Sequence, residues 1–278
     1  MSLKFLSILE VIAVFLVGAT LGSLLLELVG LKAWLSQSGS LLYNIPIDFE
    51  GLTWRVLVSN FFKYGSIFLL VGMMLNWRKD NGVKRLLGLK QVRGNSWQKL
   101  KKVLLILAVG GIFPKVLFLC WEQGIIEGGP HHWFIFREAW DGDFWGYMLV
   151  GSIILPPIVE DLFFRGYMHG RLEQSFGPMI AILLTALIFT LFHTQYLKPD
   201  LLSIGLVFSL FISALVLSYA RFATGSIIPG MIAHSLVNIP TSDVYSIIII
   251  SVFLLLIISN TQYIFNHGKL MFKLIHQN

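Results

Sequence analysis

Residues 201–219 read LLSIGLVFSLFISALVLSY, an apolar stretch without a charged side chain and about as long as one membrane-spanning helix. Comparable stretches recur along the whole chain, separated by short polar segments. The approximate blocks are Phe5–Leu28, Trp54–Leu75, Val103–Leu119, Phe144–Ile158, Met179–Phe192, Leu201–Tyr219, Ile227–Ile239 and Val244–Ser259. The pattern predicts an all-α membrane protein, a polytopic bundle of about eight transmembrane helices around a polar cavity.

The composition excludes an ordinary soluble fold. Of the 278 residues, 56% are hydrophobic and 13% are charged, whereas soluble domains carry roughly 25% charged residues. Cys120 is the single cysteine, so no intrachain disulfide can form. The formal net charge of +6 comes from basic residues between apolar blocks, where such residues set membrane topology. We therefore expect the lipid bilayer, and not a nucleic acid, as a partner.

Basic residues near helix ends prefer the cytoplasm, and this preference fixes the orientation. One acid, Asp80, opposes the basic residues between the second and third blocks. These residues are Arg78, Lys79, Lys84, Arg85, Lys90, Arg93, Lys99, Lys101 and Lys102. With this loop inside, alternation of eight spans places both termini in the cytoplasm. In a prokaryote, the membrane would be the plasma membrane.

Two adjacent acids, Glu160 and Asp161, follow the apolar run that ends at Ile158. Charges near a membrane core are costly unless they are paired or functional. Asp161 and Arg165 are four residues apart, which suits an ion pair on one helical face. Glu160 points about 100° away from Asp161 on a helix and remains unexplained by that pair.

Other polar residues interrupt the later apolar blocks. His193 ends one of them, and His234 and Asn238 lie four apart on one face of another. Taken alone, such residues are commonly hydrogen-bonded core groups or polar contacts between helices. The sequence Thr224-Gly225-Ser226 predicts a turn before the helix of His234, with Ser226 as its cap.

Taken together, these residues form an ordered set of motifs. They are Glu160 in Glu-Asp-x-x-x-Arg, Phe189-x-x-x-His193, Thr224-Gly225-Ser226 and His234-x-x-x-Asn238. The set resembles the CAAX-protease and bacteriocin-processing family of intramembrane proteases, which includes the Rce1-type CAAX prenyl endopeptidases. One departure is Asp161, because the family usually has two adjacent glutamates. The resemblance covers residues 144–240, preceded by N-terminal helices in 1–125 of no recognised family and followed by a last helix and basic tail in 241–278.

The resemblance implies an intramembrane endopeptidase that acts at the cytoplasmic side of the membrane. Glu160 and His193 would activate a water, since partial desolvation makes a carboxylate a better base near neutral pH. His234 and Asn238 would donate hydrogen bonds to the developing oxyanion. Asp161 and Arg165 would support the site. The expected substrate is a protein or peptide, with or without a lipid modification. No cofactor is expected.

Three alternatives remain open at this point. Glu160, His193 and His234 could instead bind zinc, as in a metalloprotease, although the sequence has no His-Glu-x-x-His. Glu160 and His193 could form the proton relay of a coupled transporter, or the chain could be a non-catalytic scaffold. Of the remaining polar residues, His131 and His132 fall in an outer loop, and Lys115 is expected to snorkel toward the interface.

The orientation is testable by thiol labelling. We expect a cysteine introduced by Ser96→Cys, in a Cys120→Ala background, to react with a membrane-impermeant reagent only after the inner membrane face is opened. The reason is the excess of basic residues around this position. Labelling from outside sealed cells would contradict both this orientation and a cytoplasmic site.

Overall fold

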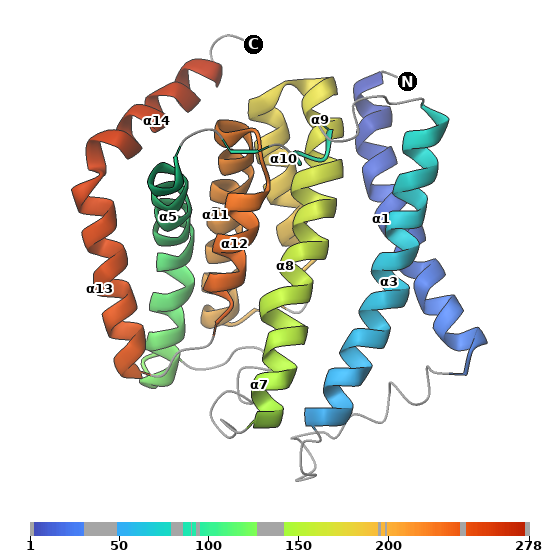
Figure 1. Ribbon diagram of the computed structural model, residues 1–278, viewed down its shortest axis with the longest axis horizontal. Helices are drawn as coiled ribbons and strands as arrows, with labels where there is room; N and C mark the ends of the chain where they lie inside the picture. Colours follow the sequence, from blue (N-terminus) through green and yellow to red (C-terminus); the bar gives the residue numbers. More distant parts are fainter. Residues whose placement is uncertain are drawn as a thin grey trace.

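The computed structural model describes residues 3–30, 49–78, 86–89, 91–92, 95–126, 142–193, 196–197, 199–239 and 243–275. These residues form a bundle of helices without a strand (Figure 1), which confirms the predicted fold class. Several residues considered above lie outside the described part. They are Lys79, Asp80, Lys84, Arg85, Lys90 and Arg93 of the basic loop, and His131 and His132.

Long helices form most of the bundle. Four of them are single α-helices, namely α1 (Leu3–Leu28), α3 (Phe49–Trp77), α5 (Ser96–Glu122) and α11 (Leu201–Thr224). A continuous run of helix, called the rod, begins at residue 142. It consists of α7 (Gly142–Met148), η2 (Leu149–Ile154), α8 (Leu155–Glu160), η3 (Asp161–Met168) and α9 (His169–Phe176). Of these segments, η2 and η3 are π-helical. The remaining helices are α10 (Pro178–Leu191), α12 (Ile228–Val237), α13 (Asp243–Ser259) and α14 (Thr261–Ile275).

The number of membrane spans differs from the prediction. Among the described residues, five helices are long and apolar enough to cross a membrane, or six if α13 and α14, which are bent by 66°, form one span. Helix α10 has 14 residues and α12 has 10. At 1.5 Å per residue they reach only about 21 and 15 Å, less than the ~30 Å of a bilayer core. The expected count of about eight is therefore not confirmed.

The fourth predicted block ended too early, because the helix continues past Ile158 to Phe176. Asp161 and Arg165 neutralise each other within this helix, with 2.9 Å between Arg165 Nη1 and Asp161 Oδ1. Both side chains are buried. The helix can therefore carry this pair through an apolar environment, although the hydropathy of the sequence falls there.

Helix α1 packs tightly against α3 through Gly18 and Gly22. A methyl group at Gly22 would lie 2.7 Å from the Cα of Lys63, and one at Gly18 would lie 2.8 Å from the Cα of Ile67. Such small residues four apart let two membrane helices approach closely. The α1 glycines thus determine where the backbone of α3 lies.

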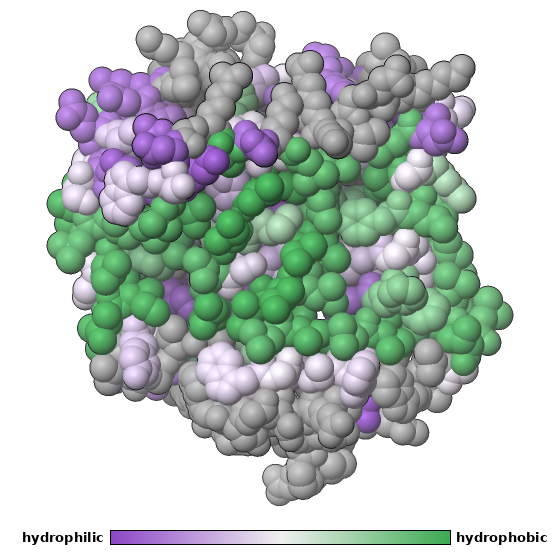
Figure 2. Space-filling model, in the orientation of Figure 1, coloured by the Kyte–Doolittle hydropathy of each residue, from purple (hydrophilic) through white to green (hydrophobic). Residues whose placement is uncertain are grey.

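Both ends of the described bundle lie at the same end of the molecule. The start of α1, the end of α14 and the start of α5 are all at the top of Figure 1. Figure 2 shows a hydrophobic band across the middle and hydrophilic residues gathered at this end. The two ends of the described bundle thus lie on the same side as the start of α5, which carries Lys99, Lys101 and Lys102. The cytoplasmic identity of that side stays a prediction.

Glu10 joins α1 to the rod and to the end of α3. Its side chain is 5% exposed and accepts hydrogen bonds from Tyr167 Oη at 2.8 Å and from Arg171 Nε at 3.1 Å. Arg78 at the end of α3 also donates to it. A buried carboxylate surrounded by three donors holds the helices in fixed relative positions.

We expect Glu10→Gln to destabilise the protein by about 1–3 kcal/mol, because charge-assisted hydrogen bonds in a buried site are lost. The change would appear as a lower thermal unfolding midpoint in detergent. Glu27→Gln, at an exposed position of the same helix, is the matched control. Equal midpoints for the two variants would contradict a structural role for Glu10.

Candidate active site

The polar residues singled out in the second half come from three neighbouring parts of the bundle. Glu160 ends α8 and Asp161 begins η3, so the acidic pair lies at a change from α-helical to π-helical hydrogen bonding. His193 follows α10. His234 lies on α12, and Asn238 is the C-terminal cap of that helix. π-Helical segments inside helices occur frequently at functional sites.

Asp161 connects two of these parts. It forms the expected ion pair with Arg165, and its Oδ2 also lies 3.4 Å from Nδ1 of His234. The Arg165 guanidinium covers the face of the Phe189 ring, with 3.8 Å between its Cζ and the ring centroid. Asp161 therefore orients His234 in addition to balancing the charge of Arg165.

The Phe189 carbonyl fixes the tautomer of His193. His193 Nδ1 lies 2.7 Å from Phe189 O, four residues earlier, which accounts for the Phe189-x-x-x-His193 spacing. A carbonyl oxygen can only accept, so Nδ1 carries the proton. In the neutral imidazole, Nε2 then has a free lone pair and can accept a proton.

Glu160 is partly buried and lies among cationic and hydroxyl groups. Its Oε1 accepts a hydrogen bond from the hydroxyl of Tyr64 on α3 at 3.3 Å. It is also close enough for electrostatic interaction with Lys63, Arg165 and His193. Glu160 and His193 are thus within range of electrostatic interaction, and their joint role in the site stays a prediction.

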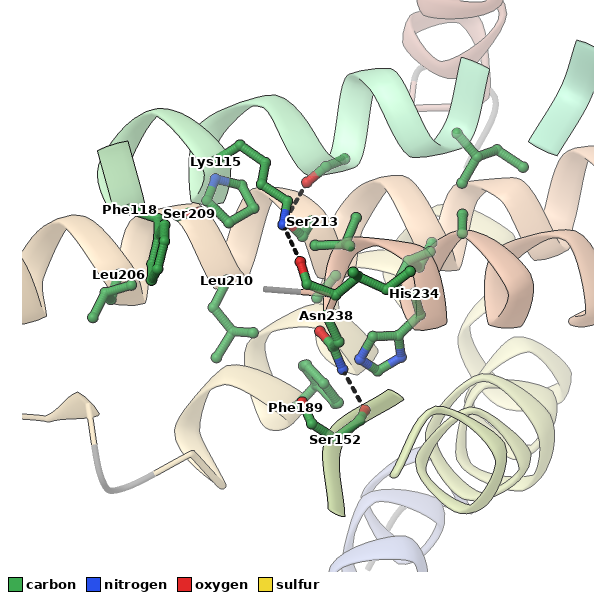
Figure 3. A pocket seen from close by; sticks show the side chains of 18 of the residues that line it. Lys115, Phe118, Ser152, Phe189, Leu206, Ser209, Leu210, Ser213, His234 and Asn238 are labelled. Carbon is green, nitrogen blue, oxygen red and sulfur yellow. Dashed lines mark hydrogen bonds between the residues drawn. The ribbon is translucent and has the colours of Figure 1, made fainter. Parts of the chain in front are cut away.

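His234 and Asn238 line a cavity of about 220 Å³ (Figure 3). Asn238 Nδ2 donates to the Ser152 carbonyl at 2.9 Å, which holds the amide in place at the cavity wall. Apolar side chains from α5 and α11 form much of the remaining wall. They include Ile106, Phe118, Leu206, Leu210 and Leu217.

Lys115 also lines this cavity and does not snorkel as expected. Its side chain is buried, and its ammonium group donates to the carbonyl of Ile239 at the end of α12 (Figure 3). A cation at the C-terminal end of a helix interacts favourably with the helix dipole. Lys115 therefore holds the end of α12, immediately after Asn238.

The Phe189 ring contacts both histidines of the candidate site. The Phe189 ring centroid is 4.4 Å from that of His193 and 6.3 Å from that of His234. Among the described residues, the cavity wall includes His234, Asn238 and Phe189 but neither Glu160 nor His193. Phe189 thus contacts His193 as well as the cavity wall that includes His234.

The Thr224-Gly225-Ser226 segment forms the predicted turn. Gly225 ends α11 with φ 69°, a left-handed conformation that favours glycine. The Ser226 N–H donates to Thr224 Oγ1, and the Ser226 hydroxyl accepts from the N–H of Ile228 in the first turn of α12. This turn sets the direction in which α12 carries His234 toward the site.

The residues considered for zinc do not converge. In the part of the chain that the structure describes, no three histidine, cysteine, aspartate or glutamate side chains are arranged as ligands of one metal ion. His234 is directed to Asp161, and His193 to a backbone carbonyl. The expectation that no cofactor is needed stays a prediction, to be tested by metal analysis.

Residues 142–240 match the family described as type II CAAX prenyl endopeptidase, Rce1-like. The matched region is similar to this family and is named the Rce1-like domain. The resemblance inferred from the motifs is confirmed, and the match includes all the candidate catalytic residues. No curated protein and no solved structure showed a significant match to the chain. The Rce1-like family is a protease family, so the domain supports an endopeptidase in an integral membrane protein.

Several groups at the site could not be assigned from the sequence. Tyr64, Lys63 and Lys115 belong to α3 and α5, outside the Rce1-like domain. Ser152 contributes only its backbone carbonyl. For Lys63 and Lys115, the sequence offered one indication of a functional role, namely a charge within an apolar helix. The sequence offered no such indication for Tyr64 or Ser152.

We expect Asp161→Asn to lower the amount of folded protein more than the activity per folded molecule. The amide oxygen can still accept from His234 but no longer balances the buried Arg165, a loss that costs about 3–5 kcal/mol. Thermal unfolding, compared with cleavage per folded molecule, measures the two effects. Asp161→Glu restores the charge and is the control. A stable Asp161→Asn variant with strongly reduced turnover would contradict this division.

Proposed function

We propose that the protein is an intramembrane endopeptidase of the CAAX-protease type that cleaves a peptide bond by a glutamate- and histidine-activated water. The observation that carries the proposal is that Glu160 lies within electrostatic range of His193, whose Nδ1 is held by Phe189 O at 2.7 Å. This arrangement supplies a carboxylate and an imidazole lone pair to one water molecule. Both residues lie within the Rce1-like domain.

In the proposed mechanism, Glu160 removes a proton from the water as its oxygen attacks the substrate carbonyl carbon. His193 Nε2 accepts the second water hydrogen in a hydrogen bond and orients the nucleophile. When the carbon–nitrogen bond breaks, Glu160 delivers its proton to the leaving amine. The two side chains thus return to their starting protonation states after the products leave.

Asn238 and His234 would stabilise the oxyanion that forms during the attack. The Asn238 amide has two N–H donors, and the contact with Ser152 O uses one of them. His234 can donate from Nε2 while Nδ1 donates to Asp161, which requires the imidazolium form. Both donors would act mainly in the transition state, where charge develops.

The substrate in this proposal is a protein or peptide, and its cleavage at the cytoplasmic side follows from the predicted orientation. A lipid-modified substrate is an expectation that rests on the family resemblance alone. The transporter and scaffold alternatives use the same Glu160 and His193 without hydrolysis, and the Rce1-like match favours the peptidase. Turnover of peptide substrates by the purified protein distinguishes these functions.

We expect Glu160→Gln and His193→Ala each to reduce cleavage of a fluorogenic peptide library by about 10²-fold or more, with folding retained. Asn238→Ala should reduce turnover by roughly 10²- to 10³-fold while binding of a non-cleavable peptide changes little, because the oxyanion contact strengthens in the transition state. Losses below tenfold for Glu160→Gln would contradict its role as the base.

Metal analysis of the same preparation separates the proposed mechanism from zinc catalysis. The wild type should remain active after treatment with a strong zinc chelator. Stoichiometric zinc, with activity lost on its removal and restored on its return, would instead make Glu160, His193 and His234 candidate ligands. Normal peptide binding without any turnover would favour the scaffold.

A further inference from the structure

Lys63 is a cation at the midpoint of α3, a helix long and apolar enough to span a membrane. An ionisable residue at this depth is costly and usually has a partner or a function. Lys63 is partly buried, and its ammonium group lies 5.1 Å from the ring centroid of Tyr64 and 5.7 Å from that of Phe15. The carboxylate with which it interacts electrostatically is Glu160.

Tyr64 contacts the same carboxylate directly. Its ring is 6% exposed within the apolar core, and its hydroxyl donates to Glu160 Oε1 at 3.3 Å. Catalytic hydrogen bonds are often long in the unliganded state and shorten when substrate binds. Two consecutive residues of α3 therefore provide a positive charge and a hydrogen-bond donor to Glu160.

The backbone of α3 is fixed at this point by α1. A methyl group added at Gly22 would lie 2.6 Å from the Phe62 carbonyl oxygen and 2.7 Å from the Lys63 Cα. Helices α1 and α3 therefore approach here more closely than a larger residue would allow. Phe15, one turn before Gly18, packs against Phe163 and Phe192 with ring centroids 5.4 and 4.3 Å apart. Helix α1 thus holds Lys63 and Tyr64 against the segment that carries Glu160.

We propose that Lys63 and Tyr64 are positioning residues that hold the Glu160 carboxylate in one orientation and balance its charge. The hydroxyl of Tyr64 fixes Oε1, which leaves Oε2 for the water, and the charge of Lys63 stabilises the carboxylate in a membrane environment. The consequence for function rests on the proposed peptidase mechanism. The active site then requires α3, which lies outside the Rce1-like domain.

Other charged groups also act on Glu160, and the test must account for them. Arg165 and His193 interact with it electrostatically from η3 and from the end of α10. These residues remain unchanged when α3 is altered, so they do not mask an effect of Lys63 or Tyr64. Loss of a nearby cation or of a hydrogen bond to a carboxylate favours its protonated form.

A hydrophobic carbodiimide, which reacts with protonated carboxyl groups, tests the proposal without requiring catalysis. The purified full-length protein is labelled across a pH series, and modification of Glu160 is quantified by peptide mass spectrometry. We expect Lys63→Gln to move the midpoint of labelling upward by about one pH unit or more. Tyr64→Phe, which keeps the ring, should move it in the same direction by a smaller amount, and Lys63→Arg should restore the wild-type midpoint.

Two matched controls separate this effect from general destabilisation. Tyr167→Phe removes another buried tyrosine hydroxyl bonded to a glutamate, namely Glu10 at 2.8 Å. Lys101→Gln removes an exposed cation whose ring contact is with Tyr263. Neither control should move the Glu160 midpoint. An unchanged midpoint in both Lys63→Gln and Tyr64→Phe would overturn the proposal.

Peptide cleavage by the same variants measures the catalytic consequence. We expect Tyr64→Phe to lower kcat about tenfold with little change in KM, since a hydrogen bond to a charged group is lost, and to move the acidic limb of the pH profile to higher pH. A change in KM alone, with kcat and the pH profile unchanged, would contradict a positioning role. If labelling shifts as expected but the wild type cleaves no peptide, the proposed peptidase function fails while the support of Glu160 by α3 stands.

Discussion

The buried ion pair between Asp161 and Arg165 is the interaction on which the site depends. Both side chains are at most 2% exposed, and such a pair is tolerated only with good geometry and further partners. Here His234 is the second partner of Asp161, and the Phe189 ring covers Arg165. The pair therefore keeps the rod helical through an apolar region and holds residues of two other helices, His234 of α12 and Phe189 of α10, against the start of η3.

Much of the site follows from local spacing, and this part was predictable from the sequence. The Asp161–Arg165 pair and the contact from His193 to Phe189 O both join residues four apart in the chain. Tertiary contacts were not predictable in the same way. Tyr64 meets Glu160 across 96 residues and Lys115 meets Ile239 across 124. Their recognition requires knowledge of how α3 and α5 pack.

Hydropathy located the apolar segments but not the ends and number of the spans. The helix past Ile158 contains Glu160, Asp161 and Arg165, which lower the local hydropathy although the charges compensate one another in three dimensions. Helices α10 and α12 show the opposite error, because each is strongly apolar but shorter than a bilayer core. Surrounding protein, as well as lipid, thus accommodates the apolar side chains of these two helices.

Hydrolysis imposes one further requirement on this arrangement. The water and the oxyanion donors must act on the same carbonyl carbon, so a substrate backbone has to lie within about 3 Å of both groups. The ring of Phe189 contacts the rings of His193 and His234, and Arg165 packs on its face. Because Arg165 is held by Asp161, the ion pair also helps to fix the position of this ring. The same two charges therefore hold Asp161, His234 and Phe189 in fixed relative positions at the site.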